Sequence, residues 1–232
     1  MKILAIIPAR GGSKGVSGKN IKLLEKKPLL AYTAEIALKS KYLTEVIVSS
    51  EDEQIIAVAK SLGIKVPFVR PTELAQDHTP TIDVIIHALQ WYESQNVFFD
   101  AVCLLQATSP FRMVAFLDKA IEKFIVSGCD SLVSVQKVPH EYNPHWTFEV
   151  NPDGNLKIAT GETEIISRRQ ELPTAYHRDG SIYMTKTEVL LQQHSLYGKS
   201  IAFIESDSEM YVNIDTMEDW EKAEIMVKNI QK

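Results

Sequence analysis

Hydrophobic and polar positions follow two different periods along the chain, and the two kinds of segment alternate. Short, almost uninterrupted apolar runs predict strands at 2–7, 45–50, 65–69, 100–105, 130–138, 181–184 and 200–205. Segments whose apolar residues recur every three or four positions predict helices at 28–40, 51–62, 81–94, 113–127 and 186–193, and from 215 to the end. Strands that alternate with helices in this way predict an α/β fold, a mostly parallel sheet covered by helices on both faces.

The starts of three helices carry capping signals. Pro28 and Pro80 are expected at the first helical position, where a missing N–H costs nothing, and Thr79 is expected to cap the helix that follows Pro80. Asp215, with Glu218 three residues later, predicts a capping box for the terminal helix.

A cationic glycine loop follows the first apolar run and extends from Ala9 to Asn20. Its four glycines permit backbone N–H groups to converge on one anion, and Arg10, Lys14 and Lys19 add positive charge, so the loop is typical of a polyphosphate site. Ser13 stands where a Walker A loop needs its first glycine, and the glycine spacing does not match a dinucleotide fingerprint. The alternative is a flexible surface loop.

The strand at 100–105 ends in the polar segment 106–112. In open α/β sheets, ligands bind beyond the carboxyl ends of the strands, so these side chains are expected near the glycine loop. The segment also suffices as a turn into the next helix, because Ser109 precedes Pro110.

Composition narrows the function. The 232 residues are 45% hydrophobic, which predicts a single domain over 1–232 with one substantial core, and the net charge of −5 argues against a nucleic-acid binder. Cys103 and Cys129 have no metal-ligand spacing and are expected to be reduced core thiols. The first apolar run is too short for a signal peptide, and no run approaches a membrane span, so the expectation is a cytoplasmic protein without membrane contact.

The alternation breaks over 139–172, a segment with several aromatic residues and a turn signal at 151–154. Such an excursion cannot bury itself alone, which suggests a partner surface. His140 and His145 lie five residues apart with no cysteine or carboxylate pattern, so they do not predict a zinc site.

Five motifs between Ile7 and Thr216 resemble those of the CMP-sialic acid synthetases, the acylneuraminate cytidylyltransferases. They are Pro8–Gly15 with Gly18–Asn20, Arg70–Asp77, Gln106–Arg112, Arg169–Tyr183 and Asn213–Thr216. The resemblance implies a Rossmann-like three-layer fold of the nucleotide-diphospho-sugar transferase type. It also implies transfer of CMP from CTP to a nine-carbon keto acid sugar with Mg²⁺ or Mn²⁺, and a homodimer formed through an arm at 139–172.

The resemblance also implies a role for individual residues. Nucleotide binding falls to Arg10, Gly11, Gly12, Ser13, Lys19, Asn20, Arg70, Thr79 and Thr81. Sugar binding falls to Gln106, Arg169, His177, Asp179 and Tyr183, and metal binding to Asp215 and Asn213. Arg10, Lys19 and Asp215 are the implied catalytic residues. Arg70 and the backbone at Thr79 would read the base, whereas the general base stays open between a metal-bound hydroxide and Asp215.

The chain departs from the family pattern at Ala107, His177, Asp179 and Asn213, where the family usually has proline, arginine, asparagine and aspartate. The loss of a fixed cation at His177 favours a bacterial nonulosonic acid such as legionaminate over N-acetylneuraminate. Alternatives are a nucleotidyltransferase that uses GTP or acts on the shorter sugar Kdo, and a regulatory nucleotide-binding domain without catalytic activity.

Overall fold

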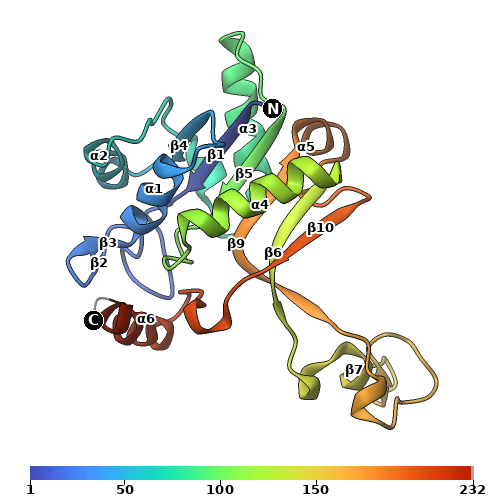
Figure 1. Ribbon diagram of the computed structural model, residues 1–232. Helices are drawn as coiled ribbons and strands as arrows, with labels where there is room; N and C mark the ends of the chain where they lie inside the picture. Colours follow the sequence, from blue (N-terminus) through green and yellow to red (C-terminus); the bar gives the residue numbers. More distant parts are fainter. Residues whose placement is uncertain (231–232) are drawn as a thin grey trace.

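The computed structural model describes residues 1–230, and its centre is a twisted sheet between two layers of helices (Figure 1). Within these residues the main sheet has six strands, in the order β10-β6-β9-β5-β1-β4. They are β1 (Ile3–Pro8), β4 (Glu45–Ser49), β5 (Ala101–Leu105), β6 (Ser131–Lys137), β9 (Tyr176–Lys186) and β10 (Ile201–Glu205). Every neighbouring pair is parallel except the two that involve β9. The predicted α/β class with a mostly parallel sheet is confirmed.

Helices cover both faces of the sheet. They are α1 (Leu29–Lys39), α2 (Glu53–Ser61), α3 (Thr81–Ser94), α4 (Val114–Ser127), α5 (Thr187–Gln193) and α6 (Met217–Ile230). In β1, Ile3, Ala5 and Ile7 share one apolar core with α1, α2 and α4, whereas Leu4 and Ile6 share another with α3 and α5. Both faces of β1 are therefore buried, which explains why its sequence is apolar throughout rather than alternating.

Helix α6 packs away from the sheet, against the glycine loop. Trp220 of α6, Val16 of the loop and Ile214 belong to one buried cluster, together with Leu24 of the hairpin formed by β2 (Leu23–Leu24) and β3 (Lys27–Pro28). Figure 1 shows α6 beside this hairpin, at the end of the molecule opposite the amino terminus. Both ends of the sequence thus contribute to one small core that supports the loop.

Two strand predictions need correction. The run at 65–69 forms only a single bridge, between Lys65 and Ile47, because Pro67 has no N–H to continue a ladder. Strand β9 is longer than the predicted 181–184 and begins at Tyr176. Its first residues are exposed and polar, and pairing with β6, which no periodicity reveals, makes them a strand.

The helix-start predictions were also wrong in detail. Pro28 and Pro80 are both N-caps with extended backbone, so each helix begins one residue later. The Thr79 hydroxyl donates to the carbonyl of Glu73, 3.1 Å away, and does not cap α3. At α6 the capping box joins Thr216 and Asp219. Asp215 and Glu218 do not form it, because the Asp215 carboxylate is engaged by Lys19.

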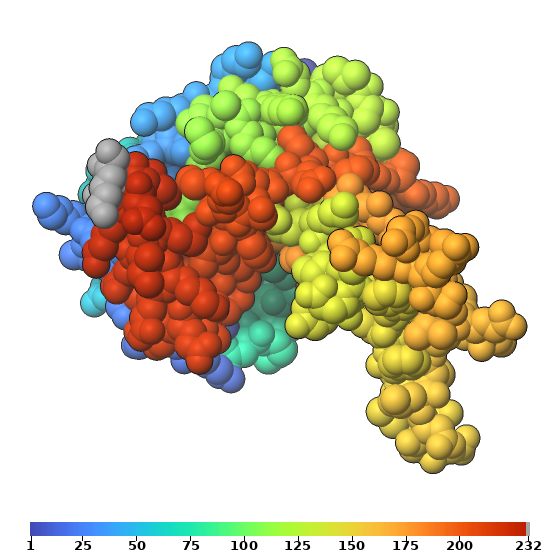
Figure 2. All heavy atoms as spheres, turned by 60° about the horizontal axis from the view of Figure 1, so that its bottom comes forward, coloured from blue at the N-terminus to red at the C-terminus, as the bar shows by residue number. Residues whose placement is uncertain are grey.

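The segment 139–172 forms an arm that projects from the body (Figures 1 and 2). It contains a hairpin of β7 (Phe148–Val150) and β8 (Leu156–Ile158) and several 3₁₀ turns. Asn143 closes the base of the arm by donating to the carbonyl of Pro173 at 2.9 Å. Apolar side chains remain exposed along the arm: Tyr142, Phe148, Val150, Leu156 and Ile165.

Two further predictions concern cysteines and membrane spans. Cys103 is a buried free thiol, as predicted, whereas Cys129 is only partly buried. Burial raises the pKa of Cys103 to about 12, so this thiol stays protonated at neutral pH. Among residues 1–230, no helix combines the length and the apolarity that a bilayer crossing requires.

Arg112 is a buried cation that joins three elements. Its guanidinium donates to the Ser181 hydroxyl at 2.9 Å and to the Ser181 carbonyl of β9, to the Gln106 carbonyl after β5, and to Thr33 of α1. Burial lowers the pKa of Arg112 to about 10, which leaves the side chain charged at neutral pH. The guanidinium therefore holds the carboxyl end of β5 in place.

We expect Arg112→Ala to lower the free energy of unfolding by about 3 kcal/mol or more, because several buried acceptors lose a charged donor. Urea denaturation followed by circular dichroism measures the change. Arg168→Ala is the matched control, since Arg168 is exposed on the arm and, among residues 1–230, pairs only with Glu171. Equal midpoints for the two variants would contradict the structural role of Arg112.

Candidate active site

An open cleft of about 970 Å³ lies beyond the carboxyl ends of β1 and β5. It is lined by Pro8, Ala9, Arg10, Lys19, Asn20, Arg70, Leu74, Gln76, Thr79, Thr81, Val84, Gln106, Ala107, Thr108 and Asp215. The glycine loop and the distant Asp215 thus share one hollow. The predicted nucleotide residues Arg70, Thr79 and Thr81 and the predicted sugar residue Gln106 border the same space.

The glycine loop is fixed to the carboxyl-terminal segment through Lys19. The Lys19 ammonium donates to the carbonyl of Ile214 at 2.6 Å and pairs with the Asp215 carboxylate at 3.1 Å. At the other side of the loop, the Asn20 side chain donates to the carbonyl of Arg10 at 3.0 Å. Asn20 therefore acts first as a brace of the loop.

Gly15 makes the contact between the loop and Asp215 possible. A Cβ atom at this position would lie 1.9 Å from the Asp215 carbonyl oxygen, far inside van der Waals contact. Gly11 has a similar constraint, because a Cβ there would lie 2.3 Å from Oδ2 of Asp52. These two glycines are needed for close approach rather than for positive φ.

Asp77 neutralises the two most exposed cations of the loop. Its carboxylate pairs with Arg10 at 2.5 Å and also with Lys14. The hydrogen bonds that Lys14 and Arg10 donate lower the pKa of Asp77, so the carboxylate is charged at neutral pH. Sequence reasoning missed this partner, because an acidic residue in a polar connection carries no signal of which cation it meets.

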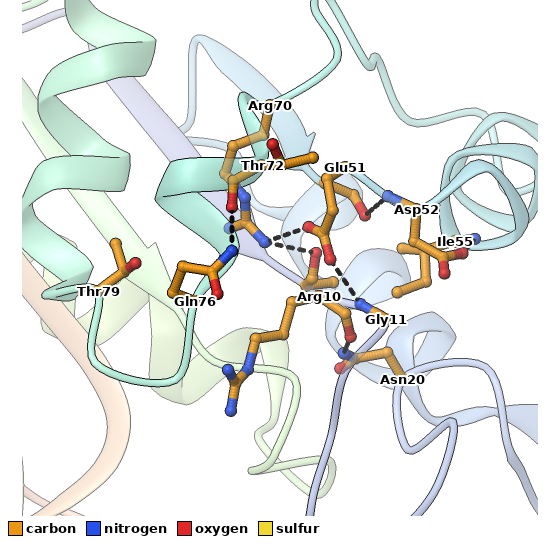
Figure 3. Close-up of polar contacts among 12 residues, drawn as sticks. Arg10, Gly11, Asn20, Glu51, Asp52, Ile55, Arg70, Thr72, Gln76 and Thr79 are labelled. Carbon is orange, nitrogen blue, oxygen red and sulfur yellow. Dashed lines mark hydrogen bonds and ion pairs between the residues drawn. The ribbon is translucent and has the colours of Figure 1, made fainter.

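Glu51 is a second residue that sequence reasoning missed. Figure 3 shows its carboxylate between the loop and Arg70. One oxygen accepts from the backbone N–H of Gly11 at 2.8 Å, and the other accepts from Arg70 at 2.6 Å. The Gly11 N–H is therefore occupied and does not point freely at an anion.

Gly180 forms part of the boundary between Gln106 and Asn213. It has a φ of +79°, and a Cβ there would lie 3.4 Å from Oε1 of Gln106 and 3.7 Å from Oδ1 of Asn213. Its neighbour Asp179 is buried and lines a separate cavity of about 490 Å³. The Asp179 carboxylate accepts from the hydroxyls of Ser134 and Ser206 and from the N–H of Ser181. Its hydrogen bonds are thus directed into the protein.

Four of the five predicted sugar residues, all except Gln106, do not line the cleft of this single chain. Arg169 is exposed on the arm, and His177 is exposed on β9 with its ring 6.4 Å from that of Tyr211. Tyr183 is buried in the core shared with α3 and α5. Of the loop residues predicted to bind nucleotide, Gly11, Gly12 and Ser13 lie outside the cleft lining, and the Ser13 N–H donates to the carbonyl of Gly11 at 3.0 Å.

The predicted metal residues offer hard oxygen ligands. Asp215 has a 62% exposed side chain, and the Asn213 amide donates to its Oδ2 at 2.7 Å. Asn213 Oδ1 is buried and has no hydrogen-bond partner within residues 1–230. In that range no group of three or more His, Cys, Asp or Glu side chains could hold a metal. Asp215 and Asn213 are thus two oxygen groups of the kind that hard divalent cations bind.

Comparisons with known proteins agree with this geometry. The sequence model of a family described as Cytidylyltransferase matches residues 4–229. The chain is 37% identical to a pseudaminic acid cytidylyltransferase of Campylobacter jejuni and to a CMP-N,N'-diacetyllegionaminic acid synthase of Legionella pneumophila, with 98% of this chain and 97% of each relative covered. A solved CMP:2-keto-3-deoxy-manno-octonic acid synthetase complexed with CTP superposes with a TM-score of 0.74 at 19% identity, covering 99% of this chain and 100% of that one.

We expect Gly15→Ala to separate the glycine loop from Asp215, because the new methyl group cannot occupy the space of the Asp215 carbonyl. Hydrogen exchange should rise in both segments, while β5 stays protected. Ser17→Ala is the control, since Ser17 is exposed in the same loop. Unchanged exchange at residues 212–216 in Gly15→Ala would contradict the contact.

Proposed function

The chain belongs to the cytidylyltransferase family, and from that premise we propose that it activates a nonulosonic acid by transferring CMP to it from CTP. The anomeric hydroxyl of the sugar attacks the α-phosphorus, the bond to pyrophosphate breaks, and a base takes up the hydroxyl proton. The chain is a nucleotidyltransferase, and the observation that supports this role best is the cleft shared by Arg10, Lys19 and Asp215.

The electrostatics of the cleft suit an anionic electrophile. A triphosphate must be neutralised before another oxygen can approach its α-phosphorus, and fixed cations provide this without reorganisation. Arg10 and Lys19 come from one side of the cleft, and the carboxylate of Asp215 lies beside Lys19. In this proposal Arg70 and the backbone near Thr79 face the base, while Thr81 approaches the ribose and Asn20 braces the loop.

Mg²⁺ or Mn²⁺ is the cofactor we propose. Asp215 would hold the ion directly, and Asn213 would contribute the amide oxygen that now lacks a partner. The bound ion would neutralise charge on the triphosphate. The protein's own contribution is to hold Asp215 next to Lys19, so that carboxylate and cation keep their places when the substrate enters.

The sugar acceptor we propose is a bacterial nonulosonic acid of the legionaminate or pseudaminate kind. Relatives named for these two sugars have the same identity to this chain, 37%. Gln106 lines the cleft and is the contact we assign first. His177, in place of the arginine of sialic acid synthetases, is the observation that disfavours N-acetylneuraminate. Because the reaction consumes CTP, we propose the cytoplasm as its location.

We propose that the arm at 139–172 forms a homodimer and completes the sugar site of the partner. Exposed apolar residues on β7 and β8 support this, since Val150 and Leu156 are 70% and 64% exposed. Arg169 lies on the same projecting segment, away from the cleft of its own chain. A partner's arm would bring its Arg169 to the reacting phosphate, and His177, which pairs with Gln136 near the end of β6, would support the base of that arm.

Purified protein should release pyrophosphate from CTP when legionaminate or pseudaminate is present, and EDTA should stop the release until Mg²⁺ is restored. The panel includes N-acetylneuraminate and Kdo as acceptors and GTP and UTP as donors. Arg10→Ala and Asp215→Asn should each reduce kcat/KM by roughly 100-fold or more, since each removes charge stabilisation at the reacting phosphate.

Matched controls for these variants lie on the surface. Lys60→Ala on α2 and Asp153→Asn at the tip of the arm remove comparable groups far from the cleft, and both should keep wild-type rates. Product formation only with GTP as the donor, or only with Kdo as the acceptor, would show that the proposed substrate pair is wrong. If the protein binds nucleotide but releases no pyrophosphate with any pair of donor and acceptor, the result would favour a regulatory nucleotide-binding domain.

The dimer predicts complementation between two inactive variants. In a mixed dimer of Arg10→Ala and Arg169→Ala subunits, one cleft has an intact loop and receives an intact arm. Random exchange should therefore restore about a quarter of the wild-type rate, and sedimentation should show a dimer. Leu156→Asp should yield monomers, whereas Asp153→Ser should not. A monomeric wild type, or mixing without recovery, would refute the shared site.

A further inference from the structure

Glu51 lies two residues after the end of β4, next to the cleft but outside its lining. Its side chain is 15% exposed, and its two oxygens serve different partners. Oε1 accepts from the Gly11 N–H of the phosphate loop, whereas Oε2 accepts from the guanidinium of Arg70 (Figure 3). One carboxylate thus joins the loop to the residue assigned to the base.

Arg70 is a buried cation whose orientation depends on few contacts. Its side chain is 3% exposed, and its Nη2 donates to Glu51 at 2.6 Å and to the Ala9 carbonyl at 3.2 Å. Its Nε is buried and has no partner within the described range 1–230. Because Arg70 lines the cleft, its fixed guanidinium borders the space that a ligand would occupy, although the buried Nε is not itself open to that space.

We infer that Glu51 is a positioning residue that fixes the guanidinium of Arg70 and thereby makes the site selective for cytosine over uracil. The inference rests on the proposed function, in which Arg70 faces the base. Glu51 itself does not reach the substrate in this arrangement. It acts by holding Nη2, which leaves the other donors of Arg70 in one orientation.

The selectivity follows from the donor pattern of the two bases. Cytosine presents two adjacent acceptors, O2 and N3, whereas uracil presents O2 beside an N3–H donor. A guanidinium held rigidly against N3 pairs with cytosine but meets a second donor in uracil, and an unpaired buried donor is costly. A guanidinium that can rotate avoids this clash, so it discriminates less.

Substitutions at Glu51 separate its two contacts. Glu51→Gln keeps an oxygen that can accept from Gly11 but removes the charge that faces Arg70. We expect the KM for CTP to rise roughly 30-fold, the size typical of breaking a buried charge pair, with kcat within about threefold of wild type. The preference for CTP over UTP should fall about tenfold or more. Glu51→Ala removes both contacts and should lower kcat as well, because the phosphate loop is released.

Two controls test whether the effect is specific. Glu53→Gln changes the same residue type on the exposed first turn of α2 and should leave KM and base preference unchanged. Glu51→Asp retains the charge and should recover part of the CTP preference. If Glu51→Asp regains CTP preference while its melting temperature stays close to that of Glu51→Gln, the preference depends on the orientation of Arg70. General stability would then not explain the difference between the two variants.

Calorimetric binding of CTP and UTP accompanies the turnover assays. If wild type prefers CTP but releases no pyrophosphate, the proposed reaction is refuted. The inference about Glu51 then still stands, provided that Glu51→Gln loses the preference for CTP. A Glu51→Gln variant that keeps the wild-type preference, or a wild type that binds neither nucleotide, would overturn the inference. If Glu51→Gln does not fold, the same comparison is made with Glu51→Asp and Arg70→Lys. The CTP preference of Glu51→Asp should then lie between those of wild type and Arg70→Lys, and a preference equal to that of wild type would overturn the inference.

Discussion

The rest of the site depends on one interaction: the Lys19 ammonium binds both the Ile214 carbonyl and the Asp215 carboxylate. The two residues are 195 and 196 positions apart from Lys19 in sequence, and the ammonium meets both of them. The apolar cluster of Val16, Ile214 and Trp220 packs next to this contact. Gly15 has no side chain, which leaves room for the Asp215 carbonyl. Without this junction the loop and the acidic residue would belong to separate surfaces, and no cleft would exist between them.

The junction is one of three places where a cation of the site is paired with a carboxylate of the same chain. Arg10 is paired with Asp77, Arg70 with Glu51, and Lys19 with Asp215. The pairs differ in burial. Arg70 and Glu51 are largely removed from solvent, whereas the Arg10 and Asp77 side chains are 32% and 40% exposed. Exposed pairs contribute little to stability, so phosphate oxygens can replace Asp77 at small cost. The buried pair is expensive to break, which makes it suited to a fixed orientation.

Sequence periodicity was sufficient for most of the sheet and helices, because buried parallel strands and amphipathic helices have distinct patterns. It failed where partners decide the structure. Residues 65–69 are apolar enough for a strand but contain Pro67, and residues 176–178 are exposed and largely polar yet pair with β6. At the site, the motifs predicted which residues border the cleft through Arg10, Lys19, Gln106 and Asp215. They did not reveal Glu51 or Asp77, because an ion pair between distant segments depends on tertiary geometry that no local spacing records.

Strand β9 links the arm to the cleft. Its first residues pair with the end of β6 at the base of the arm, and its last residues lie in the core between β5 and β6. Gly180, between these two parts, sits against Gln106 and Asn213. The antiparallel direction of β9 makes this possible, since a strand returning from the arm enters the sheet at the edge where the parallel strands β5 and β6 end. One strand therefore connects the arm to the boundary of the cleft, and its pairing with β6 shifts register between Arg178 and Tyr183, the stretch that contains Gly180. In the homodimer that we propose, contact with a partner would therefore be coupled through the backbone of β9 to the boundary of the cleft at Gly180.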